Sequence, residues 1–231
     1  MALQHSPSIV TSGLVMCVDA ASPRSYPGSG TIWYDVSGTN NNGTLTNGPV
    51  NTSGVNGYFT FDGVDDYVNV TNGMNSLVGT STVTFSAWIY RTSAPAYWAG
   101  IISNKVNVTD GICLLVNPDS KIFWQYDGGT SGVYAIYGGA TLATNTWYNI
   151  AGVYDSVGLK TYLNGVLNDS AADAGKSIAS AGNMNITIGA QDSGPGGPFP
   201  GRIAQCSVYN RSLSATEMLQ NFNALRGRYG I

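Results

Sequence analysis

The sequence has one glutamate, Glu217, and one histidine, His5, in 231 residues. Most enzymes that hydrolyse sugars use a pair of carboxylates, one protonated and one charged. Most acyl-transfer sites use a histidine as their base. Glu217 lies where a helix is expected to begin and His5 lies near the N-terminus, so neither fits such a site. This scarcity argues against an enzyme and favours a binding or structural protein.

Charge is also scarce, since charged residues make up 10% of the sequence against about 25% in an average protein. The formal net charge is −3, so the chain has no basic field to attract nucleic acid. Its polar surface is expected to consist mainly of Ser, Thr, Asn and Gly residues. Such a neutral surface suits contact with neutral sugars or dense packing among other proteins.

Long apolar runs are absent as well. No stretch of about 18 apolar residues occurs, so no insertion into a membrane is expected. The segment Met1–Val10 has neither the basic region nor the apolar region of a signal peptide. We therefore expect synthesis in the cytoplasm without secretion.

Cysteine is limited to three widely spaced residues, Cys17, Cys113 and Cys206. An odd number at such spacing does not form a disulfide framework or a metal-binding motif. Each lies within an apolar run typical of a strand, which predicts three buried free thiols.

Short apolar runs with a period of two dominate the rest, separated by clusters of Gly, Asn, Ser and Pro. This pattern predicts an all-β fold in which two antiparallel sheets pack as a sandwich. The longest strands are expected at Thr82–Tyr90 and Trp147–Asp155. The dipeptide Asn164-Gly165 favours a type I′ hairpin turn. We expect an N-terminal arm over residues 1–12 and a single domain over residues 13–231.

One helix is predicted near the C-terminus, over residues 215–225 and followed by a short tail. Ser214 is a good N-cap, and Glu217 three residues later completes a capping box. Leu213 and Met218 occupy the positions of a hydrophobic staple. This arrangement accounts for Glu217 without any catalytic role.

Several segments together resemble the laminin-G-like, concanavalin A-like jelly roll over nearly the whole chain. They are Phe61-Asp62-Gly63, Val83–Tyr90 (VTFSAWIY), Trp147–Asp155 (WYNIAGVYD), Tyr162–Val166 (YLNGV) and Phe199–Leu213 (FPGRIAQCSVYNRSL). The resemblance implies that the first and last strands, Gly13–Asp19 and Ile203–Tyr209, lie side by side. Because both strands carry a cysteine, the two thiols are expected in one buried layer. The family mostly binds sugars, proteins and sometimes calcium, and the paired glutamates of its few glycosidase members have no match here.

The opening and closing segments are similar to versions of this domain carried by tailed phages of aquatic bacteria. These segments are Gly13–Ala20, Gly28–Trp33, Asn40–Pro49 and Ser214–Ile231. The resemblance implies a non-enzymatic virion surface protein, made in the host cytoplasm, that decorates the capsid or is associated with a fibre. Other virion proteins would be its partners, and a homotrimer is expected only from how such proteins are often assembled. The alternatives are a free carbohydrate-binding or adhesion module and, less favoured, a glycoside hydrolase.

Aromatic residues in two places are candidates for glycan binding, because an exposed ring can stack on the C–H face of a pyranose. Tyr97 and Trp98 lie in the loop Arg91–Gly100. A predicted hairpin with Asp127 at its turn carries further rings. Those rings are Trp124, Tyr126, Tyr134 and Tyr137. The alternative is packing within the sheets, since Tyr and Trp favour strands.

Three carboxylates, Asp62, Asp65 and Asp66, lie within five residues. Hard cations such as Ca²⁺ prefer several oxygen ligands, so this segment could bind calcium, with Asp192 as a distant ligand. The spacing does not match an EF-hand loop. The alternative is a tight turn, where Asp and Gly are favoured for backbone reasons.

Overall fold

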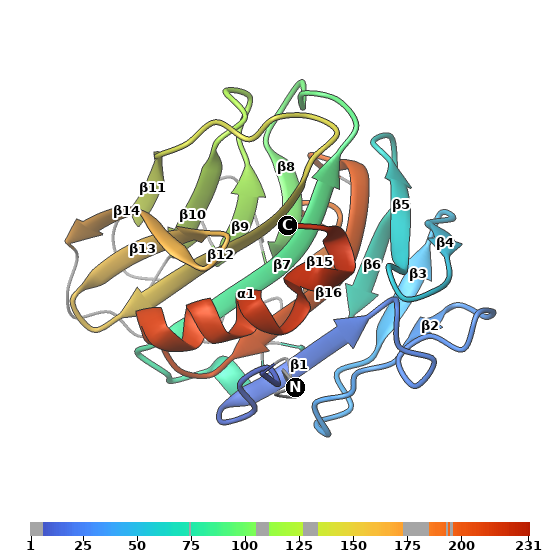
Figure 1. Cartoon of the computed structure of the whole chain (residues 1–231), viewed down its shortest axis with the longest axis horizontal. Coiled ribbons are helices and arrows are strands. Elements are labelled where there is room, and N and C mark those ends of the chain that lie inside the picture. The colour runs from blue at the N-terminus through green and yellow to red at the C-terminus, as the bar shows by residue number, and fades with distance from the viewer. Residues whose placement is uncertain are drawn as a thin grey trace, which may run out of the picture.

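A computed structural model describes residues 7–73, 75–104, 111–126, 134–172, 185–192, 194 and 196–231. Two antiparallel sheets of eight strands each pack face to face, and one helix lies across the outer face of the first sheet (Figure 1). The predicted all-β, two-sheet jelly-roll sandwich with one C-terminal helix is confirmed.

The first sheet has the order β14-β13-β12-β7-β16-β5-β4, and β1 also pairs with β16. Its strands are β1 (Leu14–Asp19), β4 (Val50–Thr52), β5 (Tyr58–Asp62), β7 (Val83–Arg91), β12 (Trp147–Asp155), β13 (Gly158–Leu163), β14 (Val166–Ala172) and β16 (Pro200–Tyr209). The ten-residue β16 is long enough for β5 to pair with its first half and β1 with its second half.

The second sheet has the order β11-β10-β9-β8-β15-β6-β3-β2. Its strands are β2 (Ile32–Trp33), β3 (Gly43–Thr46), β6 (Tyr67–Val70), β8 (Ala99–Ser103), β9 (Cys113–Val116), β10 (Ile122–Tyr126), β11 (Tyr134–Gly138) and β15 (Ile186–Ile188). A short 3₁₀ helix, η1 (Asn75–Leu77), connects β6 to β7.

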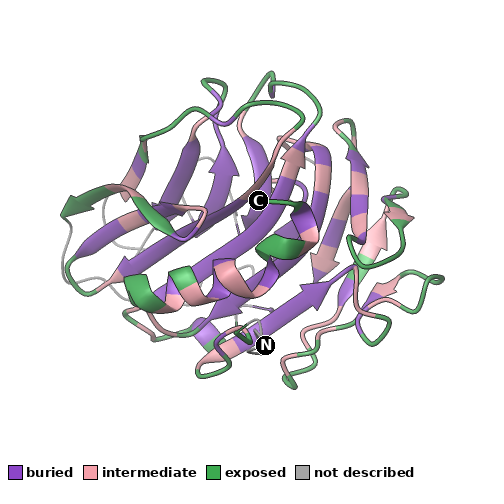
Figure 2. Cartoon of the chain, in the orientation of Figure 1, coloured by how far each residue is buried: buried purple, intermediate pink, exposed green. Residues whose placement is uncertain are grey.

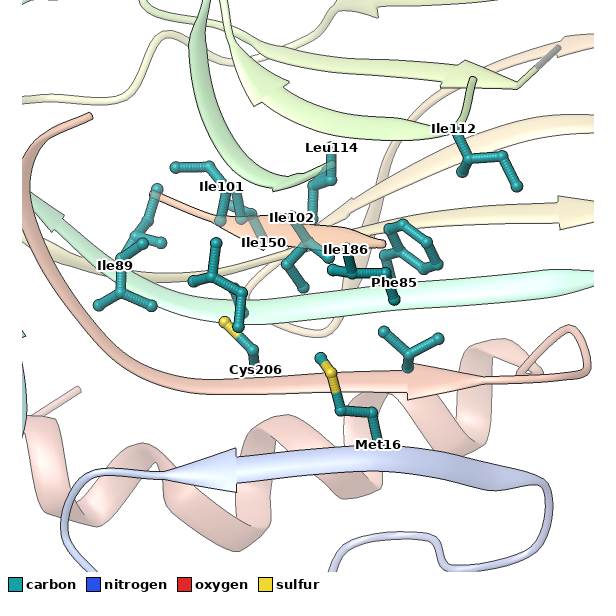
Figure 3. Packing of buried hydrophobic residues seen from close by; sticks show 14 of the residues in the cluster. Met16, Phe85, Ile89, Ile101, Ile102, Ile112, Leu114, Ile150, Ile186 and Cys206 are labelled. Atoms are coloured by element: carbon teal, nitrogen blue, oxygen red, sulfur yellow. The ribbon is translucent and has the colours of Figure 1, made fainter. Parts of the chain in front are cut away.

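The main core lies between the two sheets, where alternate side chains of both point inward. Figure 3 shows Met16 and Cys206 of the first sheet facing Ile102 and Leu114 of the second. Burial is nearly continuous along the central strands, while the connecting loops are exposed (Figure 2). Each sheet therefore has one face in the core and one outer face on which a site can form.

The first and last strands, β1 and β16, are neighbours as expected, but their cysteines do not share a layer. Cys17 is paired with Ser207 and Val18 with Cys206, so the two thiols are offset by one residue. Successive side chains in a strand point to opposite faces. Cys206 therefore enters the core, whereas Cys17 lies on the outer face beside Gln205. All three cysteines are free and buried, as predicted.

Helix α1 spans Ala215–Tyr229 and is longer than the predicted 215–225. It begins at the predicted capping box, with Ser214 as N-cap. It ends at Gly230, whose φ of 72° suits the left-handed C-cap. The extra turn is held because Tyr229 stacks on Trp88, with ring centroids 4.5 Å apart. This aromatic contact with the sheet was not visible in the helix's own sequence.

The described part of the N-terminal arm, residues 7–12, packs beside α1. The Val10 backbone N–H donates to Asn221 Oδ1 at 2.7 Å, and the Tyr209 hydroxyl donates to the Val10 carbonyl at 3.0 Å. Gln220 Nε2 donates to the Ser8 carbonyl at 2.8 Å. The arm and the helix thus form one surface on the outer face of the first sheet. Within the described residues, no helix combines the length and apolar character needed to cross a membrane.

Candidate functional site

Three aromatic residues gather on the outer face of the second sheet. This aromatic patch consists of Trp98, Phe123 and Tyr137, and the exposed Tyr97 precedes Trp98 in the chain. Phe123 on β10 and Tyr137 on β11 are direct cross-strand partners, and Trp98 precedes β8. Tyr97 is 76% exposed and Tyr137 is 61% exposed, while Phe123 is 7% exposed. The patch therefore has a buried base and accessible rings.

Ring contacts hold the patch in a fixed geometry. The Trp98 and Phe123 centroids are 4.4 Å apart with a T-shaped arrangement at 69°. Tyr137 meets Trp98 edge-on at 6.2 Å and lies nearly parallel to Phe123 at 6.1 Å. Such aromatic pairs add roughly 0.5–1.5 kcal/mol beyond burial. A ligand would thus meet rings whose positions are already set, which lowers the entropy cost of binding.

The loop that carries Trp98 is held by contacts with Gln191 and Gly197. Gln191 Nε2 donates a hydrogen bond to the Trp98 carbonyl, and the Gly100 N–H donates to the Gly197 carbonyl at 2.9 Å. A Cβ at position 197 would lie 2.1 Å from the Trp98 carbonyl oxygen. Only glycine allows this close approach at that position.

Asp192 follows Gln191 in the chain and brings a carboxylate to the same region. Its Oδ1 accepts hydrogen bonds from the backbone N–H groups of Gly194 and Gly196, both at 2.9 Å. Its predicted role as a distant metal ligand stays a prediction. Here the carboxylate shapes the loop that supports Trp98.

The structure corrects the prediction for Trp124 and Tyr126, which are fully buried in the core. Trp124 Nε1 donates to the Val153 carbonyl at 3.2 Å, and Tyr126 stacks on Tyr154 at 3.9 Å. Burial raises the pKa of Tyr126 above its ordinary value. Neither ring presents a face to a ligand.

Tyr134 is paired with Tyr126 across the hairpin and packs against the same core, so it too points inward. Asp127 lies outside the described residues. Sequence reasoning missed Phe123, which lies between Trp124 and the preceding Ile122 on β10. Successive side chains of a strand point to opposite faces, so once Trp124 faces the core, Phe123 must lie on the outer face. This alternation was the signal that could have identified Phe123.

The acidic turn between β5 and β6 brings Asp62, Asp65 and Asp66 together. One carboxylate oxygen of each lies within 4.8 Å of the others, which makes this a candidate cation site among the described residues. Asp62 Oδ1 accepts the Val64 N–H at 2.8 Å, as in a tight turn, and Asp66 Oδ2 accepts the Asp62 N–H at 2.9 Å. Both the turn and the calcium interpretations therefore fit, and the calcium site stays a prediction.

Burial raises the pKa of Asp66 above its ordinary value, and the charges of Asp62 and Asp65 act in the same direction. The hydrogen bond from the Asp62 N–H opposes this shift. A divalent cation would relieve the repulsion among the three carboxylates, because it favours their charged forms.

Glu217 has a structural role, as predicted. Its carboxylate accepts the Ser214 N–H at 2.9 Å and two hydrogen bonds from Arg211, at 2.6 and 3.0 Å. The bond from the Arg211 guanidinium lowers the pKa of Glu217 to about 2, so the carboxylate stays charged. A general acid needs the opposite shift. His5 lies outside the described residues.

Residues 62–218 match the sequence profile of the concanavalin A-like lectin/glucanases superfamily. The chain belongs to this superfamily. The match begins at the acidic turn and ends within α1, so it includes the strands that carry the aromatic patch. No curated protein sequence matches the chain.

Solved structures share the superfamily fold at low sequence identity. Domain 4 of AbnA, a GH43 extracellular arabinanase from Geobacillus stearothermophilus solved with arabinotriose, is 16% identical with a TM-score of 0.68, covering 91% of this chain and 98% of that domain. The binding domain of Paraclostridial Mosquitocidal Protein 1 is 19% identical with a TM-score of 0.69, covering 92% of this chain. Botulinum neurotoxin type C, whose cell entry depends on two ganglioside molecules, is 14% identical with a TM-score of 0.71, covering 94% of this chain. The chain spans 52% of each of these two toxin chains.

Proposed function

We propose that the chain is a non-enzymatic glycan-binding module that recognises a neutral oligosaccharide through the aromatic patch. The observation that carries this proposal is the exposed Tyr137 ring beside the half-buried Trp98 ring, both packed on a base formed by Phe123. Exposed rings stack on the apolar face of a sugar, and flanking amides and carboxylates orient its hydroxyl groups. Gln191 supplies an amide group beside Trp98, and Asp192 follows it in the chain with a carboxylate.

The similar structures support a binding role. One is an arabinanase domain solved with arabinotriose, and two belong to toxins that have binding domains or require gangliosides. The whole activities of those proteins are not implied for this chain, which spans about half of the toxin chains.

Single substitutions in the patch test the proposal. Trp98→Ala and Tyr137→Ala should each weaken binding of an oligosaccharide selected on a glycan array by about 10-fold or more, since stacking of a nucleic-acid base on an aromatic side chain, a comparable contact, is worth roughly 1–3 kcal/mol. Tyr34→Ala is the matched control, because Tyr34 is 44% exposed but lies outside the patch. Unchanged affinity in both patch variants would contradict this site.

A non-enzymatic role is supported by the lack of a second glutamate and by the structural use of Glu217. Incubation with a panel of polysaccharides should therefore release no reducing sugar. Turnover that is abolished by Asp192→Asn or another carboxylate substitution would overturn this part of the proposal.

We also propose that the module lies on the surface of a tailed-phage virion, as a capsid decoration or fibre-associated protein. The support is the resemblance of the opening and closing segments to phage versions of the domain. The described arm and α1 lie on the outer face of the first sheet, whereas the patch lies on the outer face of the second. Attachment to other virion proteins through the arm or the tail would leave the patch facing outward.

Immunogold labelling of purified virions with serum against this chain tests the location. Gold over the head is expected for capsid decoration, and gold at the tail for a fibre-associated role. Absence of gold on any particle would leave a free carbohydrate-binding or adhesion module.

A further inference from the structure

A second candidate site lies on the outer face of the first sheet, away from the aromatic patch. A half-open cavity of about 390 Å³ is formed where the N-terminal arm, β1, β16 and the last turns of α1 meet. The residues around it come from segments more than two hundred positions apart in the sequence, from Pro7 in the arm to Arg228 in α1.

Gln205 provides a buried polar group at this cavity. Its side chain is among the buried polar residues, at 4% exposure, and it lines the cavity. Nε2 donates to Ser207 Oγ and to Cys17 Sγ, the latter at 3.5 Å. Within the part of the chain that the structure describes, Gln205 Oε1 accepts no hydrogen bond, and it is not one of the enclosed side-chain atoms that lack a partner. This oxygen is therefore open to solvent at the cavity, where a ligand hydroxyl could replace water.

The charges at the cavity cancel. Asp19 is 8% exposed and accepts a hydrogen bond from Arg228 at 2.6 Å. This ion pair leaves further guanidinium N–H groups of Arg228 able to donate at the cavity wall. Neither an anion nor a cation would find an unpaired opposite charge here, so a neutral ligand is favoured.

The remaining wall is apolar. Ile9 and Leu225 belong to the arm and the helix, and Val36 and Pro7 complete the wall. The cavity therefore combines apolar surface with an acceptor at Gln205, donors at Arg228 and a hydroxyl at Ser22. This combination matches a sugar ring, which has apolar C–H faces and hydroxyl groups that both donate and accept. A volume of about 390 Å³ lies at the small end of ligand pockets.

We propose that this cavity binds a neutral polyol the size of a monosaccharide, with one hydroxyl donating to Gln205 Oε1 and another accepting from Arg228. The site does not depend on the aromatic patch, since the two lie on the outer faces of different sheets. The arm forms part of the wall, so the bound polyol would also fix the arm against α1.

Cys17 supplies a probe inside the site. Its thiol is 3% exposed and lines the cavity, whereas Cys113 and Cys206 are fully buried. Burial raises the pKa of Cys17 to about 11, so its reaction with a small methanethiosulfonate should be slow but measurable at about pH 9. Mass spectrometry of peptides separates its labelling from that of the other two cysteines.

The experiment measures the labelling rate of Cys17 in the intact chain with glucose, galactose, mannose, arabinose or myo-inositol. At a concentration ten times its Kd, a polyol in the cavity should slow labelling about tenfold. Ala224→Phe fills the cavity and should abolish this protection. Asn223→Phe is the matched control, because it adds the same ring one position earlier on α1, outside the cavity lining.

Gln205→Leu tests the proposed acceptor, since it keeps a similar side-chain volume and removes Oε1. It should weaken protection by about tenfold, the loss expected when one hydrogen bond to the ligand is removed. Trp98→Ala should leave Cys17 protection unchanged even where it abolishes oligosaccharide binding at the patch. If none of the five polyols slows labelling, or if Ala224→Phe retains protection, the proposed cavity site is wrong.

Discussion

The Glu217 carboxylate takes part in both the N-terminal cap of α1 and an ion pair with Arg211. It accepts the Ser214 N–H and both terminal nitrogens of Arg211. Because the carboxylate is stabilised in its charged form, its pKa falls to about 2 from an ordinary 4.5. The only glutamate of the chain thus stabilises the start of α1.

Glu217→Ala should lower the free energy of unfolding by about 1 kcal/mol at neutral pH, as expected for loss of a cap and a partly exposed ion pair. A carboxylate with a lowered folded pKa contributes stability above its unfolded pKa, and the contribution is lost as the pH falls towards the folded pKa. The difference between wild type and variant should therefore be constant above about pH 5 and shrink between pH 4.5 and about 2. Urea unfolding over this range measures it.

Glu217→Gln is the control, because the amide oxygen can still accept the Ser214 N–H but carries no charge. The difference in free energy of unfolding between Glu217→Gln and Glu217→Ala should depend little on pH. A gap between wild type and Glu217→Ala that stays constant down to about pH 3 would contradict the ion-pair account.

Strand β10 shows what alternation can and cannot predict. The period of two correctly indicates that Trp124 and Tyr126 share a face, but it does not say which face is buried. That choice depends on β12 of the opposite sheet, where Gly152 leaves room for the Trp124 ring: a Cβ there would lie 2.2 Å from it. Because Trp124 points into the core beside Gly152, its neighbour Phe123 points to the outer face.

Gly152→Ala should destabilise the fold by about 1–3 kcal/mol, since the added methyl group overpacks the contact between the two sheets. Gly227→Ala is the matched control, because Gly227 lies inside α1 and a Cβ there meets nothing within 4 Å. It should stabilise by about 0.5–1 kcal/mol through helix propensity. Equal effects of the two substitutions in urea unfolding would show that Gly152 does not determine which face of β10 is buried.

The turn between β5 and β6 tests the calcium prediction. If Asp62, Asp65 and Asp66 bind Ca²⁺, then millimolar Ca²⁺ should raise the Tm of wild type by a few degrees relative to chelator. The double variant Asp62→Asn, Asp65→Asn should lose this increase, while Asp119→Asn, an exposed carboxylate in another turn, should retain it. No calcium-dependent change in wild type would leave the cluster as a turn.

On the scale of the whole molecule, the two outer faces carry different features. Helix α1 lies across the outer face of the first sheet (Figure 1), where the arm and the cavity also lie, and the second sheet carries the aromatic patch. Such an arrangement permits attachment on one side and recognition on the other. It follows from the jelly-roll topology, which places β1 and β16 together and β10 and β11 in the other sheet.

Much of this architecture could be predicted from the sequence. Capping signals located the start of α1, and Asn164-Gly165 formed the expected turn, with φ of 51° and 76°. The resemblance to the superfamily placed β1 beside β16. The candidate sites were harder to predict. Trp98 contacts Phe123 only in the folded chain, and Pro7 and Arg228 line one cavity although they are far apart in the sequence. Contacts between such distant positions leave no local pattern in the chain.

The central claim is that Trp98 contacts a glycan, and NMR titration of the indole N–H signals tests it most directly. The chain has five tryptophans, of which Trp33, Trp88 and Trp124 are fully buried. An oligosaccharide selected on a glycan array should shift the Trp98 signal in a saturable way, leave those three signals in place, and lose this effect in Tyr137→Ala. A bound oligosaccharide that leaves the Trp98 signal unmoved would contradict the proposed site.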